Sequence, residues 1–282
     1  MSAVVLTSAL PPRRRSWTLL VGLVLVSVVV ATALVSLVWL PFDPSDTSGT
    51  RLEGPSATHW LGTDKLGRDL ATQLMIGARI ALTVGLGSVA VGAVIGISVG
   101  LVAAFAASWL DDTISAALDV VIAFPVLLLA MLIVAAQGAS LGSVILAIGL
   151  AMSAIVARLT RVLTKRVLGA QFVTAARTSG TRWPGIVARH ILPNIWPTLS
   201  VNLALQFGVA VLAEASLSYL GLGAPPPNAS WGRLLQEAQG TVVTAPVGAI
   251  APGLALVALV IGVNFVADGL RDVADPSRRR SR

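Results

Sequence analysis

The sequence predicts an all-α, polytopic membrane protein with about six transmembrane helices. Of its 282 residues, 55% are hydrophobic and only 12% are charged, whereas about 25% of the residues of a soluble domain are charged. The mean hydropathy of +0.85 agrees with this. Because so few polar side chains cannot cover a surface that faces water, we expect the apolar helices to face lipid.

Six apolar runs are long enough, or nearly so, to cross a hydrocarbon core of about 30 Å, which requires about 20 helical residues. The runs are 17–40, 76–109, 120–136, 141–157, 195–222 and 247–266. Pro125 in the third run is compatible with a membrane helix, since Gly and Pro are more frequent in such helices than in soluble ones. The first run could also belong to a signal peptide, but it continues to Leu40, and a signal peptide has only about 7–15 apolar residues.

Glycines recur along the second run near one helical face: Gly85, Gly92, Gly96 and Gly100. Small residues on one face allow two membrane helices to approach closely. Simple tolerance of glycine in a membrane helix explains the pattern equally well.

Basic residues predict how the chain is oriented, because Lys and Arg accumulate in cytoplasmic loops. Most of the 20 Lys and Arg residues lie in the N-terminal tail, in 158–189 and in the tail that begins at Arg271. With six spans these three regions fall on one side, so we expect both termini and the segment 158–195 to be cytoplasmic. The segments 42–75 and 224–246 are then external, 137–140 is an external tight turn, and 108–119 is a cytoplasmic turn.

Several chemistries are excluded by composition. The chain has no cysteine and only two histidines, His59 and His190, which lie far apart in the sequence. We therefore expect no metal site and no cofactor in this chain. Neither Lys65 nor Lys165 follows a glycine, so a phosphate-binding loop is absent from the sequence. The net charge of +7 reflects membrane topology, and we expect no nucleic-acid partner.

The segment 172–197 is longer than a turn between two spans requires. Residues 173–178 and 183–191 are expected to form two short helices, separated by a break that Gly180 and Pro184 mark. Pro193 is expected to start the next span, where its missing N–H costs little. The exposed apolar and basic side chains suit either docking of a partner protein or an amphipathic helix in lipid headgroups.

This segment resembles the EAA loop of ABC-importer permeases. In that family a Glu-Ala-Ala triplet is followed by a Gly four positions after the second Ala, and then by Ile-Leu-Pro. The matching residues here are Ala175, Ala176, Gly180, Ile191, Leu192 and Pro193. Thr174 stands where the family usually has an acidic residue.

Further stretches resemble motifs of the same family, in the same order. They are HWLGTDKLGRD at 59–69, GAR at 77–79, EASLSYLGLG at 214–223, PPP at 225–227, SWG at 230–232, and DGLRD at 268–272 followed by Asp275 and Pro276. Together they resemble the second permease of dipeptide and oligopeptide importers, which implies a type I ABC importer permease fold. Residues 1–75 would hold the N-terminal tail, the first helix and an external segment. Residues 76–282 would form the five-helix permease core, with the coupling loop at 158–195.

The resemblance also implies partners. The chain would pair with a homologous permease in the bacterial inner membrane, and two ATPase subunits would carry ATP and Mg. An external solute-binding protein would deliver the peptide. The residues implied in coupling to the ATPases are Thr174, Ala175, Ala176, Thr178, Gly180, Trp183, Ile191, Leu192 and Pro193. Peptide, nickel, glutathione and haem importers share this permease type.

Three ionisable residues are candidates for the pathway or a gate. Glu214 lies within the fifth run, where an ionisable residue is a functional-site hypothesis by default. A hydrogen bond that locks the outer ends of two helices is the alternative role. Arg68 and Asp69 are expected to form a local ion pair, to cap the second span, or to contact a gate or the binding protein.

A secondary transporter or channel driven by an ion gradient is the alternative function. Many such proteins contain internal inverted repeats, and no clear repeat is present in this sequence. An intramembrane enzyme is a third class. The sequence contains no HExxH motif and no paired aspartates within a span, which argues against it.

Overall fold

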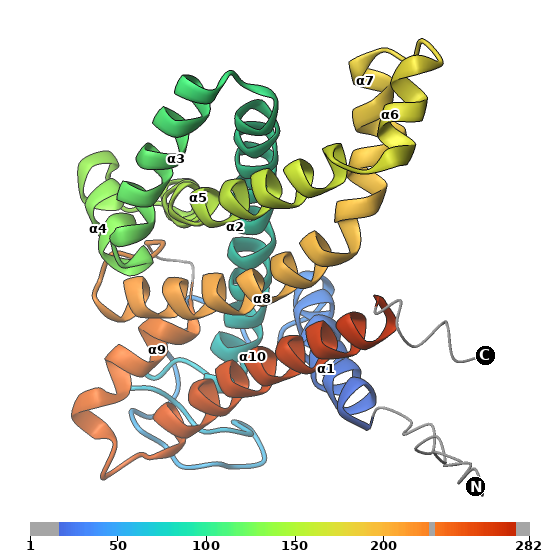
Figure 1. Ribbon diagram of the computed structural model, residues 1–282. Coiled ribbons are helices and arrows are strands. Elements are labelled where there is room, and N and C mark those ends of the chain that lie inside the picture. Colours follow the sequence, from blue (N-terminus) through green and yellow to red (C-terminus); the bar gives the residue numbers. More distant parts are fainter. Residues whose placement is uncertain (1–16, 226–228, 275–282) are drawn as a thin grey trace, which may run out of the picture.

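The computed structural model describes residues 17–225 and 229–274, and their regular elements are helices (Figure 1). The N-terminal tail, Pro226, Pro227, Asp275 and Pro276 lie outside the described residues. The elements are α1 (Trp17–Val38), α2 (Leu70–Phe105), α3 (Ser108–Ala123), α4 (Val126–Gln137), α5 (Leu141–Leu168), α6 (Gln171–Thr178), α7 (Trp183–Ile186), the π-helical turn η1 (Val187–Ile191), α8 (Leu192–Tyr219), α9 (Trp231–Ala238), the 3-10 turn η2 (Gln239–Thr241) and α10 (Val247–Ala274).

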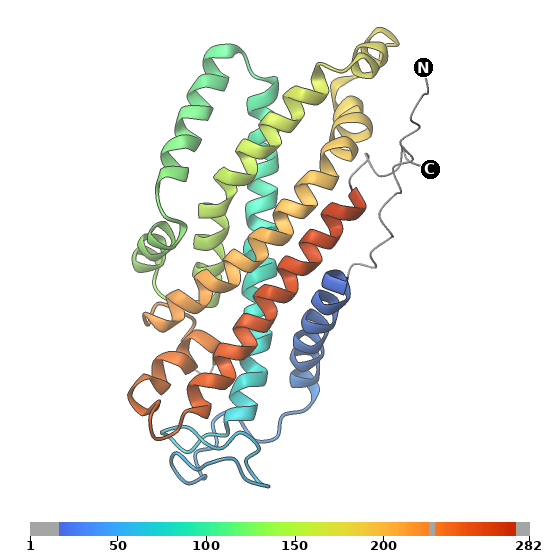
Figure 2. The same ribbon diagram turned by 60° about the horizontal axis from the view of Figure 1, so that its bottom comes forward.

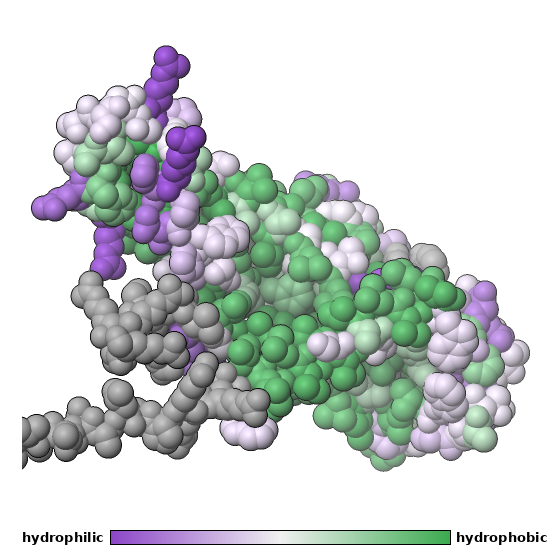
Figure 3. All heavy atoms as spheres, turned by 90° about the vertical axis from the view of Figure 1, so that its right-hand side faces the viewer, coloured by the Kyte–Doolittle hydropathy of each residue, from purple (hydrophilic) through white to green (hydrophobic). Residues whose placement is uncertain are grey.

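The long helices run between two distinct ends of the molecule (Figure 2). The short helices α6 and α7 project at one end, called the α6–α7 end below. Helix α9 and the segment 39–69 cover the opposite end, called the α9 end. Between them the surface is mainly apolar on the face shown in Figure 3. The segments that were expected on opposite sides of the membrane therefore lie at opposite ends of the helical bundle.

The expectation of about six spans is confirmed. Five helical stretches of the described chain are long and apolar enough to cross a membrane, and the pair α3 and α4 makes a sixth crossing if it counts as one. That pair is bent by 90°, so the third span is not the single helix expected over 120–136. The backbone of Phe124 is extended, with φ −82° and ψ 133°, because a residue that precedes a proline avoids the helical conformation.

Residues 108–119 were expected to form a cytoplasmic turn, and this was wrong. They begin the 16-residue helix α3. Two other helices extend beyond the apolar runs that predicted them: α2 begins at Leu70 and α5 continues to Leu168. Hydropathy detects the part of a helix that lies in lipid, whereas the helix itself continues as long as its backbone hydrogen bonds do.

Glycines of α2 allow α2 and α5 to pack closely. A Cβ atom on Gly96 would lie 2.6 Å from the carbonyl oxygen of Ser153, which is too close. A Cβ atom on Gly100 would likewise overlap the carbonyl oxygen of Ala157. Gly92 faces Gly149 in the same way, whereas Gly85 faces a ring on α8. Three of the four glycines therefore serve the close helix packing that their spacing predicts.

Helices α1 and α10 run antiparallel, and glycines bring them into close contact near the start of α1. A Cβ on Gly22 of α1 would lie 2.7 Å from the carbonyl oxygen of Gly262, and Gly269 of α10 faces the side chain of Leu19. The described start of α1 and the described end of α10 are thus close together. This arrangement is what an even number of crossings requires.

Candidate functional site

Helix α6 ends in a tight turn at the α6–α7 end. Gly180 has a φ of +84°, a conformation that glycine adopts without a steric penalty. Its N–H donates to the carbonyl oxygen of Arg177 at 2.9 Å, and the N–H of Thr181 donates to that of Ala176 at 3.0 Å. These bonds satisfy carbonyl groups that the end of a helix would leave unpaired. The helix–turn–helix expected from the sequence is therefore present.

A small apolar core fixes α6 and α7 to the bundle. Its central members are Val173, Ile186 and Ile191, whose exposed fractions are 1% or less. They pack with Ile195 and Leu199 of α8, and partly buried side chains of α2 and α5 cover them. The projecting helices are therefore held firmly, with one face buried and one face free.

The free face of α6 and α7 combines an aromatic ring with positive charge. Trp183 is 42% exposed, and the guanidinium of Arg177 lies 4.5 Å from its ring centroid, a cation–π arrangement. Phe105, at the end of α2, contacts the same indole edge-on at 5.0 Å. Figure 3 shows hydrophilic side chains projecting from this end of the molecule. Exposed apolar surface beside charge is typical of a protein-docking site.

The residues expected in coupling divide into exposed and buried groups. Thr174, Ala175, Thr178, Gly180, Trp183 and Pro193 are exposed, Ala176 and Leu192 are half-buried, and Ile191 is buried. Ile191 therefore contributes by anchoring the loop and cannot itself touch a partner. Sequence matching missed the anchors Val173 and Ile186 and the exposed Arg177. The anchors are detectable only as isolated apolar residues within a polar stretch.

The second short helix was expected to end before Pro193, where the next span would begin. This expectation was wrong. Helix α7 passes through η1 directly into α8, and the helical stretch runs from Trp183 to Tyr219, 37 residues in all. The N–H of Leu192 bonds to the carbonyl oxygen of Val187, five residues earlier. This wider turn carries the helix past Pro193, which has no N–H to donate.

At the α9 end, an ionic network joins two segments that are distant in the sequence. The Arg68 guanidinium donates from Nε to Asp64 at 2.6 Å and from Nη2 to Glu237 of α9, also at 2.6 Å. Glu237 accepts a further hydrogen bond, from Arg233 at 2.9 Å. The side chains of Arg68, Asp64 and Glu237 are 17% exposed or less.

Asp69 caps α2 and does not pair with Arg68. Its Oδ2 accepts the backbone N–H of Thr72 at 2.7 Å, and its Oδ1 lies 3.1 Å from Nδ1 of His59. The ring of Phe42 lies against that of His59, with centroids 4.6 Å apart. Of the roles expected for Asp69, the cap is the one its contacts support, and the local ion pair with Arg68 is absent.

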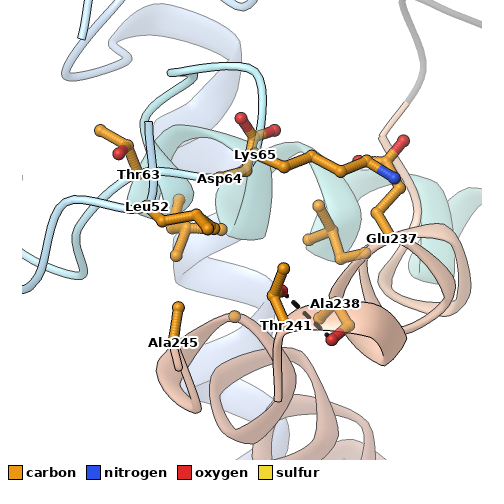
Figure 4. A pocket seen from close by; sticks show the side chains of 11 residues that line it. Leu52, Thr63, Asp64, Lys65, Glu237, Ala238, Thr241 and Ala245 are labelled. Carbon is orange, nitrogen blue, oxygen red and sulfur yellow. Dashed lines mark hydrogen bonds between the residues drawn. The ribbon is translucent and has the colours of Figure 1, made fainter. Parts of the chain in front are cut away.

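Pockets at the α9 end lie around this network. Figure 4 shows a small one between Leu52, Thr63 and Lys65 on one side and Ala238 and Thr241 on the other. A larger pocket of about 460 Å³ is lined by both arginines of the network, Glu237 and Gln73. This end therefore presents a recess of mixed charge toward the space beyond the bundle.

Glu214 is buried near the end of α8, with 2% of its surface exposed. It accepts a hydrogen bond from the Ser218 hydroxyl at 2.7 Å and also bonds to the Ser230 side chain, which caps α9. It is not among the residues that line the pockets described above. These contacts favour the locking role over a place on the transport pathway.

A third ionic cluster, at the α6–α7 end, was not foreseen. Asp111 of α3 is 5% exposed and forms a two-pronged ion pair with Arg161 of α5, at 2.5 and 2.7 Å. Lys165 contacts the same carboxylate. The nearby pair of Asp119 and Arg158 is about half exposed on both sides. Within the described ranges, no group of three or more metal-binding side chains is present.

The described chain is a helical bundle with about six crossings and a helical projection that a buried apolar core anchors at one end. It resembles a solved structure of the MetNI methionine ABC transporter in an inward-facing conformation, with a TM-score of 0.61 at 21% identity, covering 72% of this chain and 96% of that one. This likeness shows the type I permease fold.

Residues 92–280 match the family described as binding-protein-dependent transport system inner membrane component, and the chain belongs to this family. It is 36% identical over 261 residues to the dipeptide transport system permease protein DppC of Alkalihalophilus pseudofirmus, covering 92% of this chain and 86% of that protein. It is 41% identical to the glutathione transport system permease protein GsiD of Pectobacterium atrosepticum, covering 79% and 74%. A putative peptide transport system permease protein of Brucella suis is 39% identical, with 98% and 92% covered. The chain is thus an integral inner-membrane permease that works with other ABC subunits.

Proposed function

We propose that this chain forms half of the translocation pathway of an ATP-driven importer of dipeptides or oligopeptides. The relatives named above are permeases for dipeptide, glutathione and peptide transport, and glutathione is itself a short peptide. Short peptides are therefore the substrate class that these relatives share. A homologous permease would supply the other half of the pathway.

The observation that carries the coupling part of the proposal is the exposed surface of Trp183 and Arg177 above a buried anchor. Two ATPase subunits, which would bind ATP and Mg, would dock on this surface. The exposed residues Thr174, Ala175, Thr178 and Gly180 would lie along the same contact. Thr174 leaves this contact without the acidic side chain usual in the family, so the docking would rest on Trp183 and Arg177.

The orientation follows from the same proposal. The α6–α7 end and both termini would be cytoplasmic, because the basic residues concentrate there. The α9 end, with its recess of mixed charge, would face outward and receive the solute-binding protein. Family membership favours this arrangement over a transporter driven by an ion gradient or an intramembrane enzyme.

Co-purification from the native membrane tests the proposal. The tagged chain should recover a second permease and ATPase subunits, and the complex should hydrolyse ATP and support uptake of labelled dipeptide. Trp183→Ala should release the ATPase subunits while the two permeases remain together. Trp109→Ala is the matched control, because Trp109 is also exposed and lies at the same end on α3.

Two results would contradict the proposal. Recovery of the chain alone, with uptake driven by an ion gradient, would support the secondary-transporter alternative. Equal loss of the ATPase subunits in Trp183→Ala and Trp109→Ala would show that the α6–α7 surface is not the specific docking site.

A further inference from the structure

One arginine in the membrane-spanning part of the bundle has no partner in the described chain. Arg79 lies nine residues into α2, about 13 Å from the start of that helix. Arg79 is half-buried, and no hydrogen bond or ion pair of its guanidinium is found among the described residues, whereas Arg68 and Arg161 each pair with a carboxylate. A positive charge in this position is costly unless it meets an anion or reaches the headgroup region.

Arg79 is one of the residues that line an apolar groove of about 600 Å³ between α1, α2 and α8. The groove is lined along α2 by Leu82, Leu86 and Val89. Side chains of α1, of α8 (Phe207 among them) and Val263 of α10 complete the lining. Thr83 is the other polar lining residue, and its hydroxyl already donates to the Arg79 carbonyl oxygen at 2.8 Å. The guanidinium is therefore the one polar group of this lining left to bind a ligand.

Two features place Arg79 near a membrane surface. The groove wall opposite includes Leu37, in the last turn of α1. Just beyond it, Trp39 and Trp60 lie with ring centroids 6.2 Å apart and are 50% and 60% exposed. Exposed tryptophans gather at the level of lipid headgroups. The cation thus lies close to the depth of a lipid phosphate.

The length of the groove fits one lipid leaflet. From Arg79 to Val89 it follows ten residues of α2, about 15 Å of helix. Half of a hydrocarbon core is also about 15 Å. An amphiphile with an anionic head at Arg79 could therefore lay one acyl chain along Leu82, Leu86 and Val89.

We propose that the groove between α1, α2 and α8 is a binding site for an acidic phospholipid, whose phosphate pairs with Arg79. The site lies in the leaflet at the α9 end. Its assignment to the outer leaflet rests on the proposed orientation, whereas the site itself does not. A carboxylate of a partner permease would meet the charge but would leave the long apolar groove to be filled separately.

Native mass spectrometry of the purified full-length chain with its co-purifying subunits tests this site. Dioleoyl phosphatidylglycerol and dioleoyl phosphatidylcholine, which differ only in the headgroup, are titrated separately. Wild-type protein should prefer the acidic lipid, and Arg79→Gln should lower that preference about fivefold, the effect of one basic residue near an anionic headgroup. Arg79→Lys should retain most of it.

Two further variants distinguish the contribution of the lipid headgroup from that of its acyl chains. Arg51→Gln, which removes an exposed basic residue of the 39–69 segment, should leave the preference unchanged. Leu86→Trp, at a position that is 63% exposed, should fill the groove and weaken binding of both lipids alike. Soluble glycerol phosphate at the same concentration should not displace the lipid.

Three results would overturn the proposal. One is equal binding of the two lipids by wild-type protein. Another is displacement of phosphatidylglycerol by glycerol phosphate alone, which would indicate a simple anion site. The third is loss of the second permease from Arg79→Gln with no change in lipid preference, which would make the groove a subunit interface. None of these readouts depends on transport, so failure here leaves the proposed function standing.

Discussion

Nη2 of Arg68 and Oε2 of Glu237 lie 2.6 Å apart, although the two residues are separated by 169 positions in the chain. Each also has a second partner, Asp64 for the arginine and Arg233 for the glutamate. The contact joins the segment before α2 to α9, the helix that follows α8. The α9 end is thus fastened across its surface by charged groups that are largely shielded from water.

Breaking this contact should loosen the α9 end. In a double-mutant cycle of Arg68→Ala and Glu237→Ala, we expect a coupling free energy of about 1 kcal/mol, because the two groups touch directly and are partly buried. The measurement is denaturant unfolding of the purified protein in detergent. The control cycle combines Arg51→Ala, at an exposed residue, with Glu237→Ala, and its two effects should be additive. Strict additivity of both cycles would mean that the pair does not stabilise the fold.

Removing the charge of Asp111 should destabilise the packing of α3 on α5. Asp111→Asn leaves Arg161 and Lys165 without their shared carboxylate, which is itself buried, whereas the Lys165 side chain is 43% exposed. Asp119→Asn removes the other acidic residue that pairs α3 with α5, but in an exposed position, where ion pairs contribute little. We expect a clearly larger fall in Tm for Asp111→Asn, measured by thermal unfolding in detergent. An equal fall for both variants would contradict the importance of burial here.

Gly180 should be intolerant of a side chain for conformational reasons alone. A Cβ at this position would meet no atom within 4 Å, yet the φ of +84° is unfavourable for other residues. Gly180→Ala should therefore cost about 1–2 kcal/mol of local stability, and Gly180→Asn should cost less. Gly169→Ala, at the end of α5, is the control and should be nearly neutral, because its φ is −76° and a Cβ there would make only ordinary contacts.

The readout for these glycine variants is the fraction of ATPase subunits retained on co-purification, together with Tm. Weaker retention in Gly180→Ala than in Gly180→Asn is the expected order. The reverse order would show that backbone strain at this turn does not govern docking.

Glu214 should act as a structural lock and not as a contact for the substrate. Glu214→Ala should lower Tm, because the buried hydroxyls of Ser218 and Ser230 lose their acceptor. In a transport assay, the ratio of uptake of a dipeptide with a free amino group to that of its acetylated form should be the same in wild type and Glu214→Gln. A selective loss of the peptide with a free amino group would place Glu214 on the pathway.

Much of the fold could be predicted because hydropathy, basic residues and glycine spacing each respond to the membrane. The exceptions have identifiable causes. The bend at Phe124 and Pro125 depends on a local backbone preference that a 17-residue apolar run conceals. The continuation of α7 into α8 depends on a wider helical turn, η1, that composition does not encode.

The candidate site was predicted in outline only. Motif spacing located the turn at Gly180 and the exposed Trp183, because these residues follow one another closely in the chain. The partners of Asp111 are 50 and 54 positions away, and Glu237 is farther still from Arg68. Such contacts form through tertiary packing, so a single sequence gives no sign of which charges will meet.

The uninterrupted helical stretch from Trp183 to Tyr219 has a mechanical consequence. At about 1.5 Å per residue, 37 residues correspond to about 55 Å measured along the helix. This helical path connects the tip at α7 with Glu214 and bends between α7 and the rest of α8 (Figure 1). Under the proposed function, a movement of Trp183 would be transmitted along this continuous helix toward Glu214 and α9 without an intervening loop. The wide turn at η1 and Pro197 are the two places where this helix can bend.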